Sequence, residues 1–398
     1  MRILKFLGCA FMAGMVLLAA GCAADKASGD VVKVIALEKV FDKPAVELKL
    51  SDLASDIEYF ALNTGDGFLP NYKLMDLIAV EDGFFLVPMP LGDTPFFKFS
   101  PDGVLQSQFS RIGRAEGEYV APRSIAYSEE KDAFMVVDFT GPVMVFSSVG
   151  DYLYSVPTES LVDYAEIQDA IFMGDNIVFF AKTADRSKFC AVTVDSLGNI
   201  LKEKVIYEYP DNVQTGASSV KKVAEKVAEK VCFWGEGLRI TNSRFADSVL
   251  AYNNGELSVA YTFDYGTYKA DDGERKITVG GKNMESGRFF IFQAIRSTKY
   301  FNNLKPNERM NYVFFNRESG ESYRVEKDAA NQPYIKNDLD GGAPFWPKAV
   351  ANGKMYQMID AIEFMELAEQ CSSEKMKAVA ATLDENSNPV LVVVKLKE

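Results

Sequence analysis

The stretch Phe99-Ser100-Pro101-Asp102-Gly103-Val104-Leu105 runs from an aromatic strand end, through turn-forming residues and a glycine, into an apolar strand start. The pattern returns as Phe146-Ser147-Ser148-Val149-Gly150-Asp151-Tyr152-Leu153 and as Val194-Asp195-Ser196-Leu197-Gly198-Asn199-Ile200-Leu201. Turn residues between two strand-like runs predict a β-hairpin. Gly103, Gly150 and Gly198 are 47 and 48 residues apart, so the hairpin belongs to a repeated unit.

Further strands and looser copies extend this unit. Looser hairpins stand at 252–257 and 315–321, and short strands precede the first three hairpins at 82–87, 132–137 and 175–180. Several strands per unit, repeated roughly every 40–50 residues, are typical of the blades of a β-propeller. We therefore predict an all-β, six-bladed β-propeller. The predicted blades are 70–115, 120–165, 166–210, 230–268, 287–330 and 345–398.

The two ends of the propeller region predict how its ring closes. Residues 46–63 precede the first blade, and we expect them to add a strand to the last blade, which would remove the exposed sheet edges. Pro389–Leu396 is strongly apolar and suits a central sheet position. Short helical insertions are expected at 220–231, as a solvated surface helix, and at 358–380, packing over the last blade.

The N-terminus has the pattern of a secretory signal. Arg2 and Lys5 precede an apolar stretch, Phe6–Ala20, which is followed by Gly21-Cys22 and then by polar residues. The stretch is shorter than the roughly 20 apolar residues of a transmembrane helix. We expect a signal peptide at 1–21, a flexible tether at 22–45 and the propeller at 46–398. Ordinary cleavage after Ala20 or Gly21 is the alternative to a site at Cys22.

Composition excludes several classes of function. The net charge is −13, and removing Arg2 and Lys5 with the signal leaves −13 − 2 = −15, so the acidic mature chain is not expected to bind nucleic acid. The chain contains no histidine, which excludes Ser-His-Asp and Cys-His catalysis and histidine metal sites. Cys190, Cys232 and Cys371 are expected to be small buried hydrophobes, with one disulfide among them as the alternative.

Two sets of motifs resemble known families. Residues 111–127 combine a Gly-rich turn, an aromatic residue, a proline and an Ile-Ala strand start, and they resemble the link between blades in NHL-type propellers. Together with 337–342, 345–347 and 385–392, they make the chain similar to the six-bladed β-propeller lipoproteins of Gram-negative gut bacteria.

The second resemblance implies a location in the cell. The run ending at Cys22 resembles the lipobox of bacterial lipoproteins, in which the cysteine is lipidated and becomes the mature N-terminus. The resemblance implies several acyl chains, palmitate among them, and two or more chains hold a protein stably on a membrane. We expect a cell-envelope protein on the periplasmic side of the outer membrane, with the cell surface as the second choice.

Candidate ligand-face residues lie in predicted connections, because propeller connections form one face and the channel mouth. They are Arg111, Arg114, Glu118, Tyr119, Asp338, Asp340 and Trp346. The alternative is structural: Tyr119 packs between blades, Arg114 pairs with an acid, the two aspartates cap a tight turn, and Trp346 belongs to the core. Ca²⁺ at Asp338 and Asp340 is disfavoured because Gly342 stands where an EF-hand loop needs an acid.

These observations favour a non-enzymatic binding or scaffolding lipoprotein that offers one face to a glycan, a peptide or a protein. No catalytic residue, metal site or cofactor is predicted. The alternative is an NHL-like lyase or lactonase with carboxylates and Ca²⁺ in the channel, which the missing histidines argue against. A third hypothesis is an assembly factor that contacts other envelope proteins.

Overall fold

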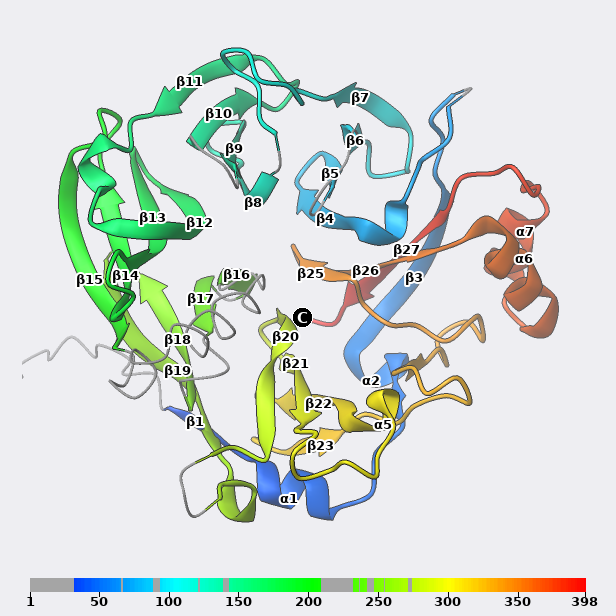
Figure 1. Ribbon diagram of the computed structural model, residues 1–398. Coiled ribbons are helices and arrows are strands. Elements are labelled where there is room, and N and C mark those ends of the chain that lie inside the picture. The colour runs from blue at the N-terminus through cyan, green and yellow to red at the C-terminus, as the bar shows by residue number, and fades with distance from the viewer. Residues whose placement is uncertain are drawn as a thin grey trace, which may run out of the picture. The chain divides into compact units, whose positions relative to one another are not determined.

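The computed structural model describes residues 32–65, 67–88, 94–120, 122–138, 143–208, 232–235, 237–241, 247–253, 255–270 and 274–398. In these residues, six antiparallel four-stranded blades stand in a ring, one of them extended by a fifth, parallel strand, which confirms the predicted six-bladed β-propeller (Figure 1). The signal segment, Cys22 and the helix predicted at 220–231 lie outside the described residues.

Each blade runs from an inner strand near the ring axis to an outer strand at the rim (Figure 1). Blade 1 is β4 (Met75–Val80), β5 (Gly83–Pro88), β6 (Phe96–Phe99) and β7 (Leu105–Phe109). Blade 2 is β8 (Pro122–Ser128), β9 (Ala133–Asp138), β10 (Val143–Ser147) and β11 (Tyr152–Val156). Blade 3 is β12 (Tyr164–Met173), β13 (Asn176–Thr183), β14 (Lys188–Val194) and β15 (Ile200–Glu208).

The second half of the ring repeats this order. Blade 4 is β16 (Cys232–Gly235), β17 (Gly237–Thr241), β18 (Ser248–Asn253) and β19 (Glu256–Asp264). Blade 5 is β20 (Ile277–Glu285), β21 (Phe289–Arg296), β22 (Met310–Asn316) and β23 (Ser322–Arg324). Blade 6 is β25 (Ala349–Ala351), β26 (Lys354–Ile359), β27 (Val390–Leu396) and β3 (Ala54–Ala61).

The start predicted for blade 5, at residue 287, is wrong, because β20 begins at Ile277. This inner strand carries Gly280 and Gly281 followed by polar residues, and its pairing with β21 shifts register between Gly280 and Met284. Glycines and a bulge interrupt the apolar alternation by which a strand is recognised in a sequence.

The repeated glycines occupy one equivalent place in the fold. Each lies in the hairpin between the third and fourth strands of blades 1 to 5, and each has a positive φ. They are Gly103 (84°), Gly150 (90°), Gly198 (80°), Gly255 (81°) and Gly320 (73°). Blade 6 has no sixth copy because its fourth strand, β3, comes from the other end of the propeller.

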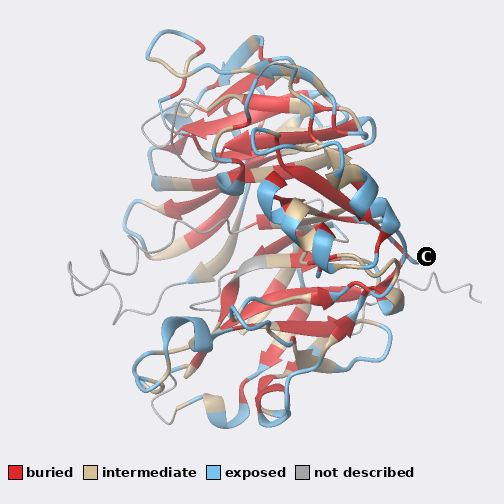
Figure 2. Cartoon of the chain, turned by 90° about the vertical axis from the view of Figure 1, so that its right-hand side faces the viewer, coloured by how far each residue is buried: buried red, intermediate tan, exposed pale blue. Residues whose placement is uncertain are grey.

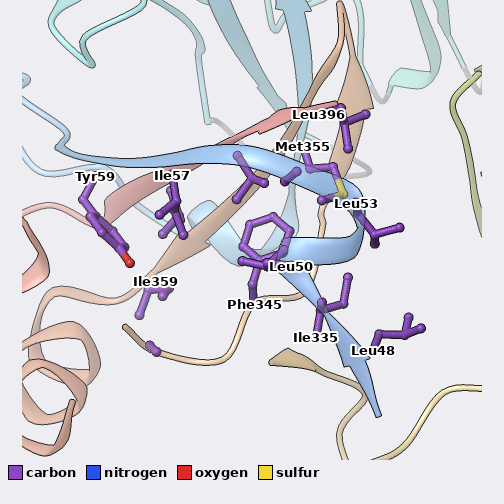
Figure 3. Close-up of a cluster of buried hydrophobic side chains, with 14 of the residues drawn as sticks. Leu48, Leu50, Leu53, Ile57, Tyr59, Ile335, Phe345, Met355, Ile359 and Leu396 are labelled. Atoms are coloured by element: carbon purple, nitrogen blue, oxygen red, sulfur yellow. The ribbon is translucent and has the colours of Figure 1, made fainter. Parts of the chain in front are cut away.

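Ring closure by the N-terminal segment is confirmed. β3 pairs antiparallel with β27, from Ala61 opposite Val390 to Ala54 opposite Leu396. β27 therefore lies between two strands, at the interior position expected for so apolar a segment. Figure 3 shows Ile57 and Tyr59 of β3 among the buried side chains that fill this closing blade.

The hydrophobic core lies between blades. Six clusters of buried side chains are found in the described residues, and each joins two neighbouring blades. On β13, Ile177 and Phe179 face blade 2, whereas Val178 and Phe180 face blade 4. Because successive side chains point to opposite faces of a strand, the middle strands are apolar throughout. Figure 2 shows these strands as mostly buried and the turns as mostly exposed.

The expected tether extends less far than predicted. Its last part forms β1 (Lys33–Ala36), which pairs in parallel with β19, and α1 (Leu37–Asp42), which packs against blade 5. Ile35 and Leu37 are fully buried. These apolar side chains hold the segment against the propeller, so a flexible tether is left as a prediction only for 22–31, outside the described residues.

Short elements complete the chain. β2 (Leu48–Lys49) pairs in parallel with β24 (Ile335–Lys336), and α2 (Leu50–Leu53) leads into β3. The remaining short elements are η1 (Tyr72–Leu74), η2 (Glu159–Leu161), η3 (Gly266–Tyr268) and α5 (Pro306–Arg309). No helix in the described ranges combines the length and the apolarity needed to cross a membrane.

The insertion predicted at 358–380 forms α6 (Ala361–Gln370) and α7 (Glu374–Ala380). Asp360 and Ser373 cap the two helix starts by accepting hydrogen bonds from backbone N–H groups two and three residues ahead. Met376 packs into the blade 6 core as expected, whereas Ile362 is exposed.

Gly150→Ala is predicted to destabilise the propeller more than Gly353→Ala. Both glycines have positive φ, which costs another residue about 1–2 kcal/mol. A Cβ at Gly150 would also lie 2.3 Å from Cγ of Phe109 in blade 1, whereas Gly353 has nothing within 4 Å. We expect a loss of about 2–4 kcal/mol against about 1–2 kcal/mol in urea unfolding. Equal losses would contradict the contact between hairpin and neighbouring blade.

Candidate functional site

The links from each outer strand to the next inner strand define what we call the connection face. Because all blades repeat the same strand order, equivalent links lie on the same side of the ring. The candidate ligand-face residues all fall in two of these links. Arg111 to Tyr119 lie between blades 1 and 2, and Asp338, Asp340 and Trp346 lie between blades 5 and 6.

Exposed apolar side chains stand at equivalent places on this face. Leu74, Val120 and Val162 lie one or two residues before β4, β8 and β12, and their exposed fractions are 67%, 43% and 75%. We call these three residues the apolar arc. The corresponding positions before β20 and β25 hold Lys276 and Lys348. Among the described inner-strand starts, the arc is therefore confined to blades 1 to 3.

Buried polar groups lie next to the arc in blades 2 and 3. The carboxylate of Asp138 accepts a hydrogen bond from the backbone N–H of Val120 at 2.5 Å. Ser124 donates its hydroxyl to Asp169, which links the inner strands of the two blades. Gln168 is more than nine-tenths buried, and its side-chain Nε2 has no hydrogen-bond partner. An unsatisfied buried donor costs about 1–3 kcal/mol, which a bound acceptor would recover.

Two of the candidate ligand-face residues stabilise the conformation of the link between blades 1 and 2. Arg111 donates Nε to the carbonyl oxygen of Gly150 at 2.7 Å, and its guanidinium lies 3.9 Å from the carboxylate of Asp151. Glu118 accepts a hydrogen bond from the backbone N–H of Ala115 at 2.8 Å. Arg114 differs from both, because it is exposed and forms no ion pair with a described residue.

Tyr119 packs between blades 1 and 2. It is 1% exposed, and its ring meets that of Phe146 edge to face, with 5.9 Å between the centroids. Burial raises the pKa of its hydroxyl above the usual value. The ring therefore serves the core between two blades, as the structural alternative expected.

Asp338 and Asp340 bind the segment that closes the ring. Asp338 accepts hydrogen bonds from the backbone N–H and the hydroxyl of Ser51, at 2.9 and 2.6 Å. Burial opposes ionisation of Asp338, but these two bonds hold its pKa below the usual range. Asp340 accepts hydrogen bonds from Tyr59 on β3, at 3.1 Å, and from Ser373 at the start of α7.

Further contacts complete the environment of these residues. Asn337 Nδ2 and the backbone N–H of Gly342 also donate to Asp340, at 2.7 and 3.0 Å. Burial, and then the charge of Asp340, raise the pKa of Tyr59. Trp346 is half-buried and packs edge-on against Tyr312, with 4.9 Å between ring centroids. Ligand binding by the seven predicted residues stays a prediction.

Cys190 and Cys232 are buried and Cys371 is half-buried, and no disulfide joins any two of them, so the alternative of one disulfide among the three is wrong. Burial, followed by the charge of Glu203, raises the pKa of the Cys190 thiol to about 11. Within the described part of the chain, no group of three or more Cys, Asp or Glu side chains is placed to hold a metal ion.

Comparisons with known proteins bear on the fold. The family model described as a domain of unknown function (DUF4934) matches residues 32–395. A structure named as an exported protein from Bacteroides fragilis is 13% identical, has a TM-score of 0.63, and covers 92% of this chain and 100% of its own. A DUF4221 member from Bacteroides vulgatus is 12% identical with a TM-score of 0.48, covering 89% and 99%. No curated protein matches. At such identities the first structure shows the fold alone.

Asp340→Ala is predicted to lower the free energy of unfolding by about 2–4 kcal/mol, because it leaves the buried partners of a carboxylate without an acceptor. Urea unfolding of the purified chain measures this loss. Glu369→Ala, on the exposed side of α6, is the matched control and should change stability by less than about 0.5 kcal/mol. Equal stability of the two variants would contradict the closing role of Asp340.

Proposed function

The chain belongs to the DUF4934 family, and on this premise we propose that it is an envelope lipoprotein that binds a protein partner on its connection face and catalyses no reaction. The observation that carries this proposal is the apolar arc. The side chains of Leu74 and Val162 are 67% and 75% exposed, whereas the apolar side chains between the blades are buried. Exposed apolar groups gathered on one face mark interaction surfaces.

The chemistry of the arc favours a protein over a glycan. Leucine and valine offer apolar area but no hydrogen bonds for sugar hydroxyls, and Trp346 already packs against Tyr312. Fully burying one such side chain against a partner contributes about 1.5–3 kcal/mol. Exposed Arg114, in the same link as Val120, adds a charge at the edge of this surface.

The place where the described chain begins suits an anchored protein. Val32 precedes β1, which lies on the outer edge of blade 4, opposite blade 1 in the ring (Figure 1). Val32 follows Cys22 by ten positions, and an extended segment of that length spans at most about 35 Å. The exported Bacteroides fragilis protein agrees with an envelope address.

Cys22→Ser is predicted to abolish lipidation and membrane association. Cells grown with labelled palmitate should give a labelled wild-type chain in the membrane fraction, and an unlabelled Cys22→Ser chain. Cys9→Ser is the matched control, because Cys9 lies inside the signal segment and should leave both results unchanged. Labelled, membrane-bound Cys22→Ser protein would refute the anchor.

Replacing the arc residues together, as Leu74→Ser, Val120→Ser and Val162→Ser, is predicted to reduce partner capture at least tenfold, which corresponds to about 1.4 kcal/mol. Crosslinking in intact envelopes, followed by quantification of the captured proteins, measures this. The folded chain should keep its stability, because exposed substitutions usually change it by less than about 0.5 kcal/mol.

The matched control for the arc replaces two exposed apolar residues at the rim of blade 3, as Leu197→Ser and Leu201→Ser. These side chains have similar exposure but lie away from the inner-strand starts. Capture should persist in this control. An equal loss in both variants, or no loss in either, would show that the arc is not the binding surface.

A further inference from the structure

Two arginines of blade 5 stack on one aromatic ring of the N-terminal segment. The guanidinium carbons of Arg296 and Arg324 lie 4.9 and 5.5 Å from the ring centroid of Phe41, on α1. Arg296 also lies 5.4 Å from the ring centroid of Phe301. Aromatic faces attract cations, so these rings hold two like charges close together. Figure 1 shows α1 beside β23, the strand that ends at Arg324.

Lys327 adds a third positive charge to this cluster. Burial, followed by the charges of Arg296 and Arg324, lowers the pKa of Lys327. The same two causes, burial and then the charge of Arg296, lower the pKa of Arg324. The three groups therefore repel one another in a partly buried place, and the fold nevertheless brings them together.

No carboxylate of the described chain neutralises this cluster. None of Arg296, Arg324 and Lys327 forms an ion pair with a described residue, although the whole chain has 56 acidic and 43 basic side chains. Glu308 acts on Lys327 from a distance, but its carboxylate accepts a hydrogen bond from the backbone N–H of Lys305 at 2.7 Å and caps α5.

Part of the donor capacity of the cluster is unused. Arg324 gives one Nη2 bond to the carbonyl oxygen of Lys43 at 2.6 Å. Lys327 donates to the carbonyl oxygens of Asn307 and Met310, at 2.7 and 2.5 Å. The Nε atoms of both arginines are buried and have no acceptor. Arg296 forms no hydrogen bond to a described residue, so its two Nη groups are left to bind a ligand.

We propose that Arg296, Arg324 and Lys327 form a binding site for the oxyanion of a phosphate or sulfate ester, between α1 and blade 5. A guanidinium donates two parallel N–H bonds to such a group, and a lysine adds a point charge. Bound oxyanion would neutralise the repulsion and accept hydrogen bonds from the unused Nη groups. The ester can belong to a lipid headgroup or to a soluble molecule. The site stands independently of the proposed partner-binding function.

Calorimetric titration of the purified Cys22→Ser chain with inorganic phosphate and with sulfate, at low ionic strength, tests the site. We expect binding and a raised Tm with either anion, and no effect of chloride at equal ionic strength. Arg296→Gln should weaken phosphate binding at least tenfold, and Arg296→Lys should restore part of it. Lys354→Gln removes one exposed charge on blade 6 and should change nothing.

Lys327→Gln is a second test variant in case Arg296→Gln disturbs folding, because Lys327 does not stack on Phe41. This variant should also weaken phosphate binding while its urea unfolding midpoint stays near that of the parent chain. A parent chain that binds neither anion would overturn the proposal, as would unchanged binding in both Arg296→Gln and Lys327→Gln.

Flotation with vesicles distinguishes the sources of the ester. Vesicles of phosphatidylcholine with phosphatidylglycerol are compared with vesicles of phosphatidylcholine alone, again with the Cys22→Ser chain so that no lipid anchor contributes. Binding that needs phosphatidylglycerol and is lost in Arg296→Gln supports the site with a lipid headgroup as ligand. Phosphate binding without vesicle binding supports it with a soluble ester.

Discussion

The pairing of β3 with β27 is the interaction on which the ring depends, because the sixth sheet is built from both ends of the propeller. Without it, β27 would keep an unpaired edge, and the clusters shared with blades 5 and 1 would lose Ile57 and Phe60 of β3. The hydrogen bonds of Asp338 to Ser51 and of Asp340 to Tyr59 act at the same place. Carboxylates that suggest a ligand in the sequence therefore hold the closing segment to the ring.

Closure also decides where the N-terminal segment runs. On its way to β3 the chain adds β1 to blade 4 and lays α1 against blade 5. This path brings Phe41 under Arg296 and Arg324, although about 250 residues or more separate them in sequence. The N-terminal segment thus contributes the aromatic ring on which the two arginines stack. The apolar arc lies on blades 1 to 3, whereas the cationic cluster lies on blade 5.

The connection face shows how much of a binding surface a sequence can reveal. The links between blades were recognisable in the sequence, and Arg114 is exposed in one of them. Tyr119 is buried instead. An aromatic ring near the start of a strand can lie in the interior or on the surface, and the ring of Tyr119 lies in the interior because it packs against Phe146 of blade 2. The signal for the arc was an apolar residue just before the inner strands of blades 1 to 3, but the exposure of a side chain cannot be read from its residue type.

Local patterns determined the blades. Turn chemistry explains the glycine with positive φ between the third and fourth strands of blades 1 to 5. Burial between neighbouring sheets explains why the strands are apolar on both faces. Both are properties of short segments. Only the tertiary structure decided that residues 33–42 pack on the ring, that blade 5 starts at Ile277, and that two arginines meet on Phe41. Each of these features depends on contacts between segments that are distant in sequence, and a short stretch of sequence does not show how strong such contacts are.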